Sequence, residues 1–175
     1  MTGSPIGFVV YDRDSKPDPV LREVVRRLEV QRVRVRGLLQ HGEQNEAAVC
    51  ATMTLEDIGT GRRVQIFERR GHETRGCRLD PSGLAEAAVW VRESIEARPE
   101  ILFINRFGRQ EAEGRGLVDE IGAALSADIP TIIPVGRALL PDWEEFAGGE
   151  GMHLPNDADG LEAWCLSHLA RLPPA

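Results

Sequence analysis

The residues best suited to bind a ligand follow a short apolar run at positions 101–104. Such a run is typical of a buried strand, and open α/β sheets bind ligands at the carboxyl ends of their strands. The polar loop at positions 105–116 contains two amides and three arginines: Asn105, Arg106, Arg109, Gln110 and Arg115. Guanidinium groups and the free N–H groups of a helix start suit an anion, so this loop predicts an anion-binding site. The alternative is a loop whose charges pair with one another, with Glu111 and Glu113 as partners of the arginines or as a base.

The first position of this loop is poorly suited to the metal ion of a nucleotide hydrolase. Such enzymes hold magnesium with an acidic residue near the end of this strand and orient water with a nearby side chain. Asn105 occupies that position, and its neutral amide holds a divalent cation poorly. The sequence therefore predicts no bound metal and no catalytic residue here, and it favours binding over phosphate cleavage.

A second arginine-rich loop, at positions 68–79, is also suited to an anion. Residues 62–78 hold six arginines against two glutamates. Glycines let the backbone curl while arginines donate to a tetrahedral oxyanion, which makes Arg75, Cys77 and Arg78 further candidates for the anion site. A thiol between two arginines could have a lowered pKa. His72 and Cys77 could also join a metal site, although two such ligands alone are a weak signal.

The loop from Asp12 to Pro19 lacks the features of a phosphate-binding P-loop. It contains no glycine, two prolines that remove N–H donors, and three aspartates that would repel a triphosphate. An enzymatic alternative uses Asp12 and Asp14 with Lys16 and a magnesium cofactor, as a phosphohydrolase or nucleoside-triphosphatase. The simpler interpretation is a solvated loop in which Asp18 caps the following helix.

The remaining cysteines and histidines are expected to be structural. Three cysteines at wide spacing match neither a disulfide framework nor a metal knuckle. Cys50 is expected inside a strand, and Cys165 and His168 are expected to pack in the core from the apolar face of the last helix. His41 and His153 are expected in loops.

The elements that position these loops alternate along the chain. Strands are predicted at 6–11, 33–40, 49–55, 63–67, 101–104 and 131–135, and helices at 18–31, 80–98, 117–125, 141–146 and around 161–169. Asp80 before a proline is expected to cap the second helix. Alternating strands and helices imply parallel strands joined by right-handed crossovers, with one β-hairpin through residues 59–61. The predicted fold class is α/β, a three-layer α/β/α sandwich with a mostly parallel sheet.

Composition limits the classes of partner. The 175 residues suit a single domain, 1–175, and no apolar run approaches the ~20 residues that span a bilayer. We therefore expect a soluble, cytoplasmic protein without a membrane partner. The net charge is −7, and residues 138–162 hold seven acids and no lysine or arginine. This acidic segment and the single tyrosine argue against nucleic acid as a partner. A homodimer is an expectation from base rates alone.

Three separated motifs resemble those of a bacterial domain family of unknown function, over nearly the whole chain. They are Thr54-Leu-Glu-Asp-Ile-Gly-Thr-Gly, Arg75-Gly-Cys-Arg-Leu-Asp-Pro and Asn105-Arg-Phe-Gly-Arg-Gln-Glu-Ala-Glu-Gly-Arg-Gly. That family is similar to thermophilic nucleoside-triphosphatases and has a loose connection with molybdenum transport. The resemblance implies a P-loop NTPase-like fold and an oxyanion ligand.

The leading hypothesis is a non-hydrolysing protein that binds a small anion, either molybdate, tungstate or a phosphate-like oxyanion, or a phosphorylated metabolite. The alternative is the magnesium-dependent enzyme described above. A third interpretation is an interaction module in which the acidic segment 138–162 contacts a partner or the arginine-rich loop of a second copy.

Overall fold

The structure is a computed structural model that describes residues 4–42, 53–69 and 77–169. Its strands are β1 (Ile6–Tyr11), β2 (Val35–His41), β3 (Thr54–Asp57), β4 (Arg63–Gln65), β5 (Phe67–Arg69), β6 (Cys77–Leu79), β7 (Ile101–Phe103), β8 (Thr131–Gly136) and β9 (Met152–Leu154). Its helices are α1 (Asp18–Val30), α3 (Pro81–Glu96), α4 (Arg109–Ala112), α5 (Val118–Ser126), α6 (Leu140–Phe146) and α7 (Ala158–Leu169), with a 3₁₀ turn at Arg137–Leu139.

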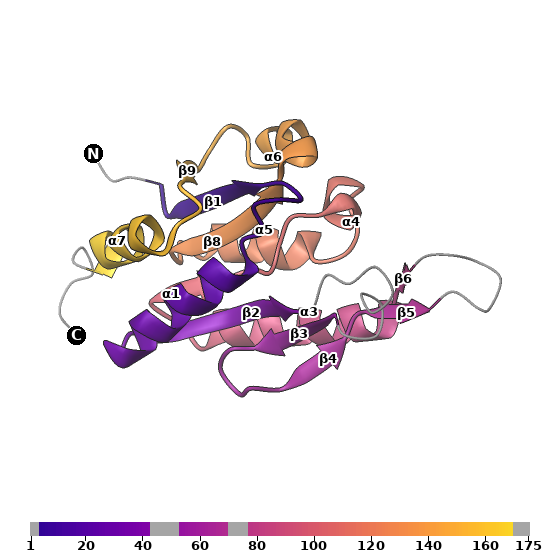
Figure 1. Ribbon diagram of the computed structural model, residues 1–175, viewed down its shortest axis with the longest axis horizontal. Helices are drawn as coiled ribbons and strands as arrows, with labels where there is room; N and C mark the ends of the chain where they lie inside the picture. The colour runs from indigo at the N-terminus through magenta and orange to yellow at the C-terminus, as the bar shows by residue number, and fades with distance from the viewer. Residues whose placement is uncertain (1–3, 43–52, 70–76, 170–175) are drawn as a thin grey trace.

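Seven of the strands form one sheet in the order β4-β3-β2-β7-β8-β1-β9. Neighbouring strands are parallel from β2 to β9, while β3 and β4 continue the sheet as an antiparallel hairpin. Strands β5 and β6 pair with each other in a separate two-stranded sheet. The mostly parallel sheet with one hairpin is confirmed, and Figure 1 shows helices on both of its sides.

Two apolar clusters explain the three layers. On one face, α1 and α7 cover side chains of the central strands such as Val9, Ile101 and Ile132. On the other face, α3 and α5 cover Leu38, Leu102 and Ile133. Side chains alternate between the faces because successive residues of a strand point to opposite sides. In the part of the chain that the structure describes, no helix is both long enough and apolar enough to span a membrane.

One of the two predicted helix caps is confirmed, and the other is wrong. Asp80 caps α3 as predicted, since its carboxylate accepts a hydrogen bond of 2.9 Å from the Ser82 N–H. Asp18 is not a cap, because α1 already begins at this residue and the carbonyl of Pro17 accepts the first helical N–H, from Leu21 at 2.9 Å. The Asp18 carboxylate contacts Arg106 instead.

Several short elements differ from the predictions. His41 is the last residue of β2 and His153 lies in β9, so both are strand residues and the loop prediction is wrong. Strand β9 was not predicted, and β5 and β6 lie partly in the segment predicted as an arginine-rich loop. These strands are only three residues long, too short for an alternating pattern to show.

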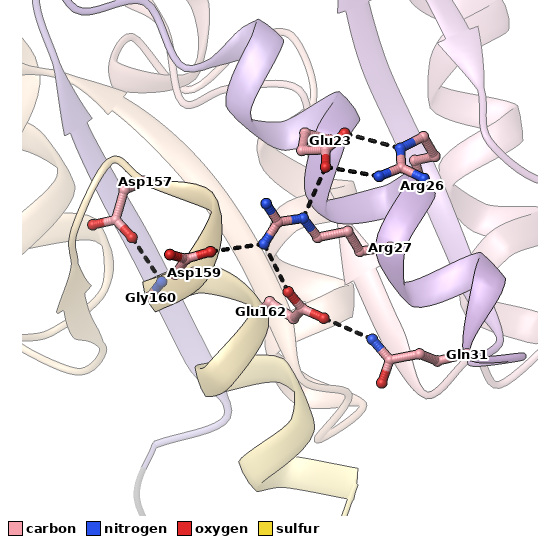
Figure 2. A network of polar contacts seen from close by, with 8 residues as sticks. All are labelled: Glu23, Arg26, Arg27, Gln31, Asp157, Asp159, Gly160 and Glu162. Atoms are coloured by element: carbon pink, nitrogen blue, oxygen red, sulfur yellow. Dashed lines mark hydrogen bonds and ion pairs between the residues drawn. The ribbon is translucent and has the colours of Figure 1, made fainter.

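Polar contacts tie α7 to α1 on the surface of the molecule. Arg27 donates hydrogen bonds to Glu23 at 2.8 Å, to Asp159 at 2.8 Å and to Glu162 at 2.9 Å. Figure 2 shows these contacts together with Arg26 and Gln31, which bond to Glu23 and Glu162. We call this set of six side chains the α1–α7 network.

Candidate functional site

A pocket of about 260 Å³ opens where β2 and β7 end, and we call it the strand-end pocket. Its polar lining residues are Gln40, Asn105, Arg106, Arg109, Gln110 and Glu111, and its apolar ones are Met53, Ile66, Phe67, Leu79, Leu84 and Leu117. Figure 1 shows the helix α4 and the β5–β6 pair toward the end of the molecule at which the arrows of β1 and β2 point. This is where a parallel α/β sheet is expected to bind ligands. Four of the predicted anion-binding residues meet here: Asn105, Arg106, Arg109 and Gln110.

Two buried amides line the inner part of the strand-end pocket. Asn105 follows β7 and is 5% exposed, and Gln40 near the end of β2 is 6% exposed. Leu38, two residues before Gln40, packs in the core on the same face of the sheet, so this face changes from apolar to polar as the strand ends. The Asn105 Oδ1 atom is buried and has no hydrogen-bond partner in the part of the chain that the structure describes. An unpaired buried acceptor is costly, and a donor supplied by a ligand would relieve that cost.

Arg106 connects this pocket with the loop after β1. Its Nη1 donates to the Tyr11 hydroxyl at 3.2 Å, its Nη2 lies 3.1 Å from the Asp18 Oδ1, and its guanidinium lies over the Tyr11 ring. Its Nε atom is buried without a partner. Arg106 is therefore anchored, and only part of its hydrogen-bonding capacity is left for a ligand.

The other arginines of the loop have different surroundings. Arg109 is exposed, lines the strand-end pocket and has no ion pair among the described residues. Gln110 lines the pocket beside it. Arg115 pairs with Glu113 and is not part of the pocket lining. The structure thus does not bring Arg115 to the other candidates, because a neighbouring carboxylate holds it at the surface.

Glu111 holds the loop in shape and is not the partner of an arginine. It is 8% exposed, and its two carboxylate oxygens accept the Gly108 N–H at 2.9 Å and the Leu117 N–H at 2.8 Å. Gly116, with φ of 65°, lies so close that a side chain there would collide with the same carboxylate. Glu111 therefore ties α4 to the start of α5 and shapes the mouth of the pocket.

The loop between β1 and α1 is held by hydrogen bonds among its own residues. The Asp12 Oδ1 accepts hydrogen bonds from the Ser15 hydroxyl at 2.8 Å and from the Asp14 N–H at 3.1 Å. The hydroxyl of Ser15 in turn accepts the Asp12 N–H at 3.1 Å. The Ser15 hydrogen bond holds the pKa of Asp12 below its ordinary value. Two backbone N–H groups that a P-loop would turn toward phosphate are thus engaged by side chains.

Lys16 is the residue that falls where a P-loop would place its lysine. It is partly buried, and this burial, together with the charge of Arg106, lowers the pKa of its amine. The Arg106 guanidinium, bound to Asp18 in the first turn of α1, lies close by. An arginine and a carboxylate therefore meet where a P-loop protein would place phosphate at the helix start.

The second arginine-rich loop is only partly described. Arg75 and His72 lie outside the described residues, as does Cys50. The backbone of Cys77 and Arg78 forms β6, but their side chains are outside the description. Phe67 of β5 and Leu79 of β6, which face each other in register, line the strand-end pocket. That the arginines of this loop reach the pocket stays a prediction.

No group of three or more metal-ligating side chains is found within residues 4–42, 53–69 and 77–169. Cys165 is fully buried in the core, and burial raises the pKa of its thiol to about 12. His168 is also buried and bonds to the carbonyls of Trp164 and Ser4. Core packing of these two residues is confirmed.

Sequence reasoning missed Gln40 and Tyr11 as parts of the site. Gln40 stands out only as a buried polar residue directly after the apolar pair Leu38 and Leu39, and this signal was available in the sequence. Tyr11, as the last residue of a buried strand, gives no comparable signal. The partners of Arg106 are the last residue of β1 and the first residue of α1, 88 or more positions away, so only the fold could reveal them.

Two solved structures have the same fold over nearly the whole chain. THEP1 from the hyperthermophile Aquifex aeolicus gives a TM-score of 0.67 at 11% identity, over 96% of this chain and 99% of that one. A human cancer-related nucleoside triphosphatase gives 0.63 at 12% identity, over 97% and 99%. The fold is therefore that of the P-loop NTPase-like α/β proteins, as predicted.

The chain belongs to the family described as Protein of unknown function (DUF2478), whose model matches residues 6–164. It is also 31% identical over 159 residues to the molybdenum import ATP-binding protein ModC 2 of Bradyrhizobium diazoefficiens. That match takes in 91% of this chain and 18% of the relative, so the chain spans less than a fifth of that protein's length. The family resemblance seen in the sequence is confirmed.

Proposed function

We propose that this chain is a non-hydrolysing binding protein whose strand-end pocket holds a small organic anion of the phosphorylated-metabolite class. The observation that carries the proposal is the lining of the pocket. Arg109 lines it without an ion pair among the described residues, and Asn105 offers a buried oxygen without a partner. A charged donor and a free acceptor in one apolar pocket are typical of a ligand site.

The apolar wall favours a ligand with a carbon skeleton over a bare oxyanion. Phe67, Leu79 and Leu84 contribute to this wall, and they offer no hydrogen bonds to molybdate or tungstate. A tetrahedral oxyanion transferred from water would need donors on all sides, because an unpaired charge in an apolar setting is costly. A phosphorylated metabolite can place its phosphate at Arg109 and its carbon skeleton against the wall.

The loop after β1 supports the absence of hydrolysis. Phosphoryl transfer depends on positioning and electrostatic stabilisation by a backbone cradle, a lysine and magnesium. Here Asp12 is engaged by Ser15 and Asp14, and the Asp18–Arg106 pair lies at the start of α1. The carboxylates of Asp12 and Asp18 are thus already bound within the protein and do not form the backbone cradle that a triphosphate needs.

The names of the relatives determine which other ligands must be tested. One structure of the same fold is named as a nucleoside triphosphatase, and a longer relative is named for molybdenum import and ATP binding. Molybdate, tungstate and ATP are therefore the competing ligands.

Isothermal calorimetry at low salt tests the proposal with phosphate, sulfate, molybdate, tungstate, ATP and a set of sugar phosphates and nucleotides. We expect heat from at least one phosphorylated organic ligand and weaker or no heat from the inorganic oxyanions. Tight binding of molybdate or tungstate alone would replace the phosphorylated metabolite by a metal oxyanion. Absence of heat from the whole panel would remove the proposal.

Turnover separates this function from the enzymatic alternative. With magnesium and ATP, or with a panel of phosphate esters, we expect no release of phosphate above the rate without protein. Steady release that disappears in Asp12→Asn would establish the Asp-dependent enzyme instead. A matched Asp14→Asn variant would then show whether the second aspartate takes part.

The interaction-module interpretation has less support from the described contacts. Asp159 and Glu162, two of the seven acids in the segment 138–162, already bond to Arg27 within the same chain. Sedimentation at low and high salt would reveal a dimer held by the remaining acids as self-association that salt abolishes.

A further inference from the structure

Two amide side chains, and not a ring of charges, form the inner lining of the strand-end pocket. Gln40 and Asn105 come from two neighbouring parallel strands, and both are more than nine-tenths buried. Primary amides carry a donor and an acceptor side by side, which matches the hydrogen-bonding edge of a planar nitrogen heterocycle. A sugar or a simple acid has no such flat edge.

We propose that the ligand of this pocket is a nitrogen heterocycle that carries a single phosphate, the class to which nucleoside monophosphates belong. This inference rests on the proposed function and names its ligand class. The Asn105 Oδ1 atom, which has no partner in the free protein, accepts a hydrogen bond from an N–H group of the heterocycle. Gln40, on the neighbouring strand, contacts the same edge.

The apolar side chains around the amides fit the faces of a heterocyclic ring. Phe67, Leu79 and Leu84 belong to the lining together with the two amides. Flat rings bind between apolar or aromatic side chains while their edges meet a few polar groups, and this combination is the common pattern for small-molecule sites. The amides of the pocket therefore suit the edge of the ring, and the apolar side chains suit its two faces.

The charges that the structure describes at the pocket favour a ligand with one phosphate. Of the two arginines that line the pocket, Arg106 is paired with Asp18, and only Arg109 is without an ion pair among the described residues. Glu111 also lines the pocket, but both of its oxygens accept backbone N–H groups. The volume of about 260 Å³ lies just below the usual range of about 300–1,000 Å³ for ligand sites, which suits a small ligand. A single phosphate matches the one lining arginine that has no ion pair among the described residues.

Calorimetry with a matched pair of probes tests the inference. The probes are the 5′-monophosphates of adenosine, guanosine, cytidine and uridine, with ribose 5-phosphate as the control that lacks only the heterocycle. We expect at least one nucleotide to bind about tenfold to 100-fold more tightly than ribose 5-phosphate. Asn105→Leu is expected to abolish this preference, whereas Arg115→Gln, which lies outside the pocket lining, is expected to keep it. Gln40→Leu is expected to reduce the preference in the same direction.

The outcomes separate the inference from the proposed function. Equal binding of nucleotides and ribose 5-phosphate would overturn the heterocycle and leave the anion-binding proposal standing. Absence of binding by both classes of probe would overturn the two together. Tighter binding of ATP than of every monophosphate would overturn the limit to one phosphate.

Thermal unfolding of Asn105→Leu separates ligand recognition from a structural role. Because Asn105 Oδ1 is unpaired in the free protein, replacing it with an apolar side chain of similar size should leave the Tm unchanged or raise it. A variant that keeps its Tm but loses the preference for nucleotides supports the inference. A clear fall in Tm with equal loss of all probes would assign Asn105 to the architecture of the loop.

Discussion

The α1–α7 network and the strand-end pocket use similar side chains in opposite ways. In the network, Arg27 contacts three carboxylates within 2.9 Å. In the pocket, neither an ion pair of Arg109 nor a hydrogen-bond partner of the Asn105 Oδ1 is found among the described residues. Polar groups whose hydrogen bonds and ion pairs are all made within the protein stabilise the fold. Buried polar groups without such partners cost stability, and they are retained where a ligand supplies the missing partner.

The largest expected effect comes from Glu111, a carboxylate of the pocket lining whose two oxygens both accept hydrogen bonds. Glu111→Ala removes the acceptor for two backbone N–H groups, each hydrogen bond to a charged group being worth about 1.5–3 kcal/mol. We expect a loss of about 3 kcal/mol in the free energy of unfolding, measured by urea denaturation. The matched control is Glu113→Ala, an exposed carboxylate two positions away, with an expected change within about 0.5 kcal/mol. Equal effects for both variants would remove the structural role assigned to Glu111.

A smaller effect is expected from the centre of the α1–α7 network. Arg27→Met keeps the aliphatic packing but leaves Asp159 and Glu162 without their shared cation. We expect the Tm to fall by about 2–4 °C while ligand binding stays unchanged. Arg26→Met is the control, because Arg26 contacts only Glu23 and is more exposed, and its Tm should change by less than about 1 °C. A loss of ligand affinity in Arg27→Met would contradict the claim that the α1–α7 network stabilises the fold without affecting the strand-end pocket.

The smallest effect is a dependence on pH at the edge of the same network. Hydrogen bonds from Arg26 and Arg27 lower the pKa of Glu23 from 4.5 to about 2. A carboxyl whose pKa is lower in the folded state stabilises the fold fully above pH 4.5, and this contribution is lost as the pH falls toward 2. The Tm difference between the wild type and Glu23→Gln should therefore be present at pH 7 and shrink below pH 4.5. A difference in Tm that stays constant from pH 7 down to pH 2 would contradict this role of Glu23.

The layout of the fold follows from patterns that the sequence displays directly. Helix α1 buries Leu21, Val24, Val25 and Leu28, the spacing expected of one helical face, and β1 is the continuous apolar strand of a parallel sheet. The three-residue strands β5, β6 and β9 are held by tertiary pairing and leave no periodic signal, whereas the equally short β7 was recognised from its continuous apolar run. Short strands without such a run depend on contacts that are distant in the sequence.

The positions of some predicted site residues also depend on contacts between residues that are distant in the sequence. The loop after β7 was recognised from its composition, and Asn105, Arg106, Arg109 and Gln110 do line one pocket. The sequence offered Glu113 as a partner of the arginines, and Arg115 confirms it, but the sequence could not show that Arg106 bonds to Asp18, because that carboxylate lies 88 positions away. A loop rich in charged residues indicates a binding site. The charged and polar side chains without a partner in the protein show where in that loop the ligand binds.

The arginines at positions 109 and 115 provide the most direct test of the account. Both are exposed residues of the same loop, but only Arg109 lines the strand-end pocket without an ion pair. Calorimetry with the tightest phosphorylated ligand of the wild type should show a loss of affinity of about tenfold or more in Arg109→Gln. Arg115→Gln should bind within about twofold of the wild type. Equal losses in the two variants, or a loss in Arg115→Gln alone, would contradict the claim that unmatched groups at the end of β7 form the ligand site.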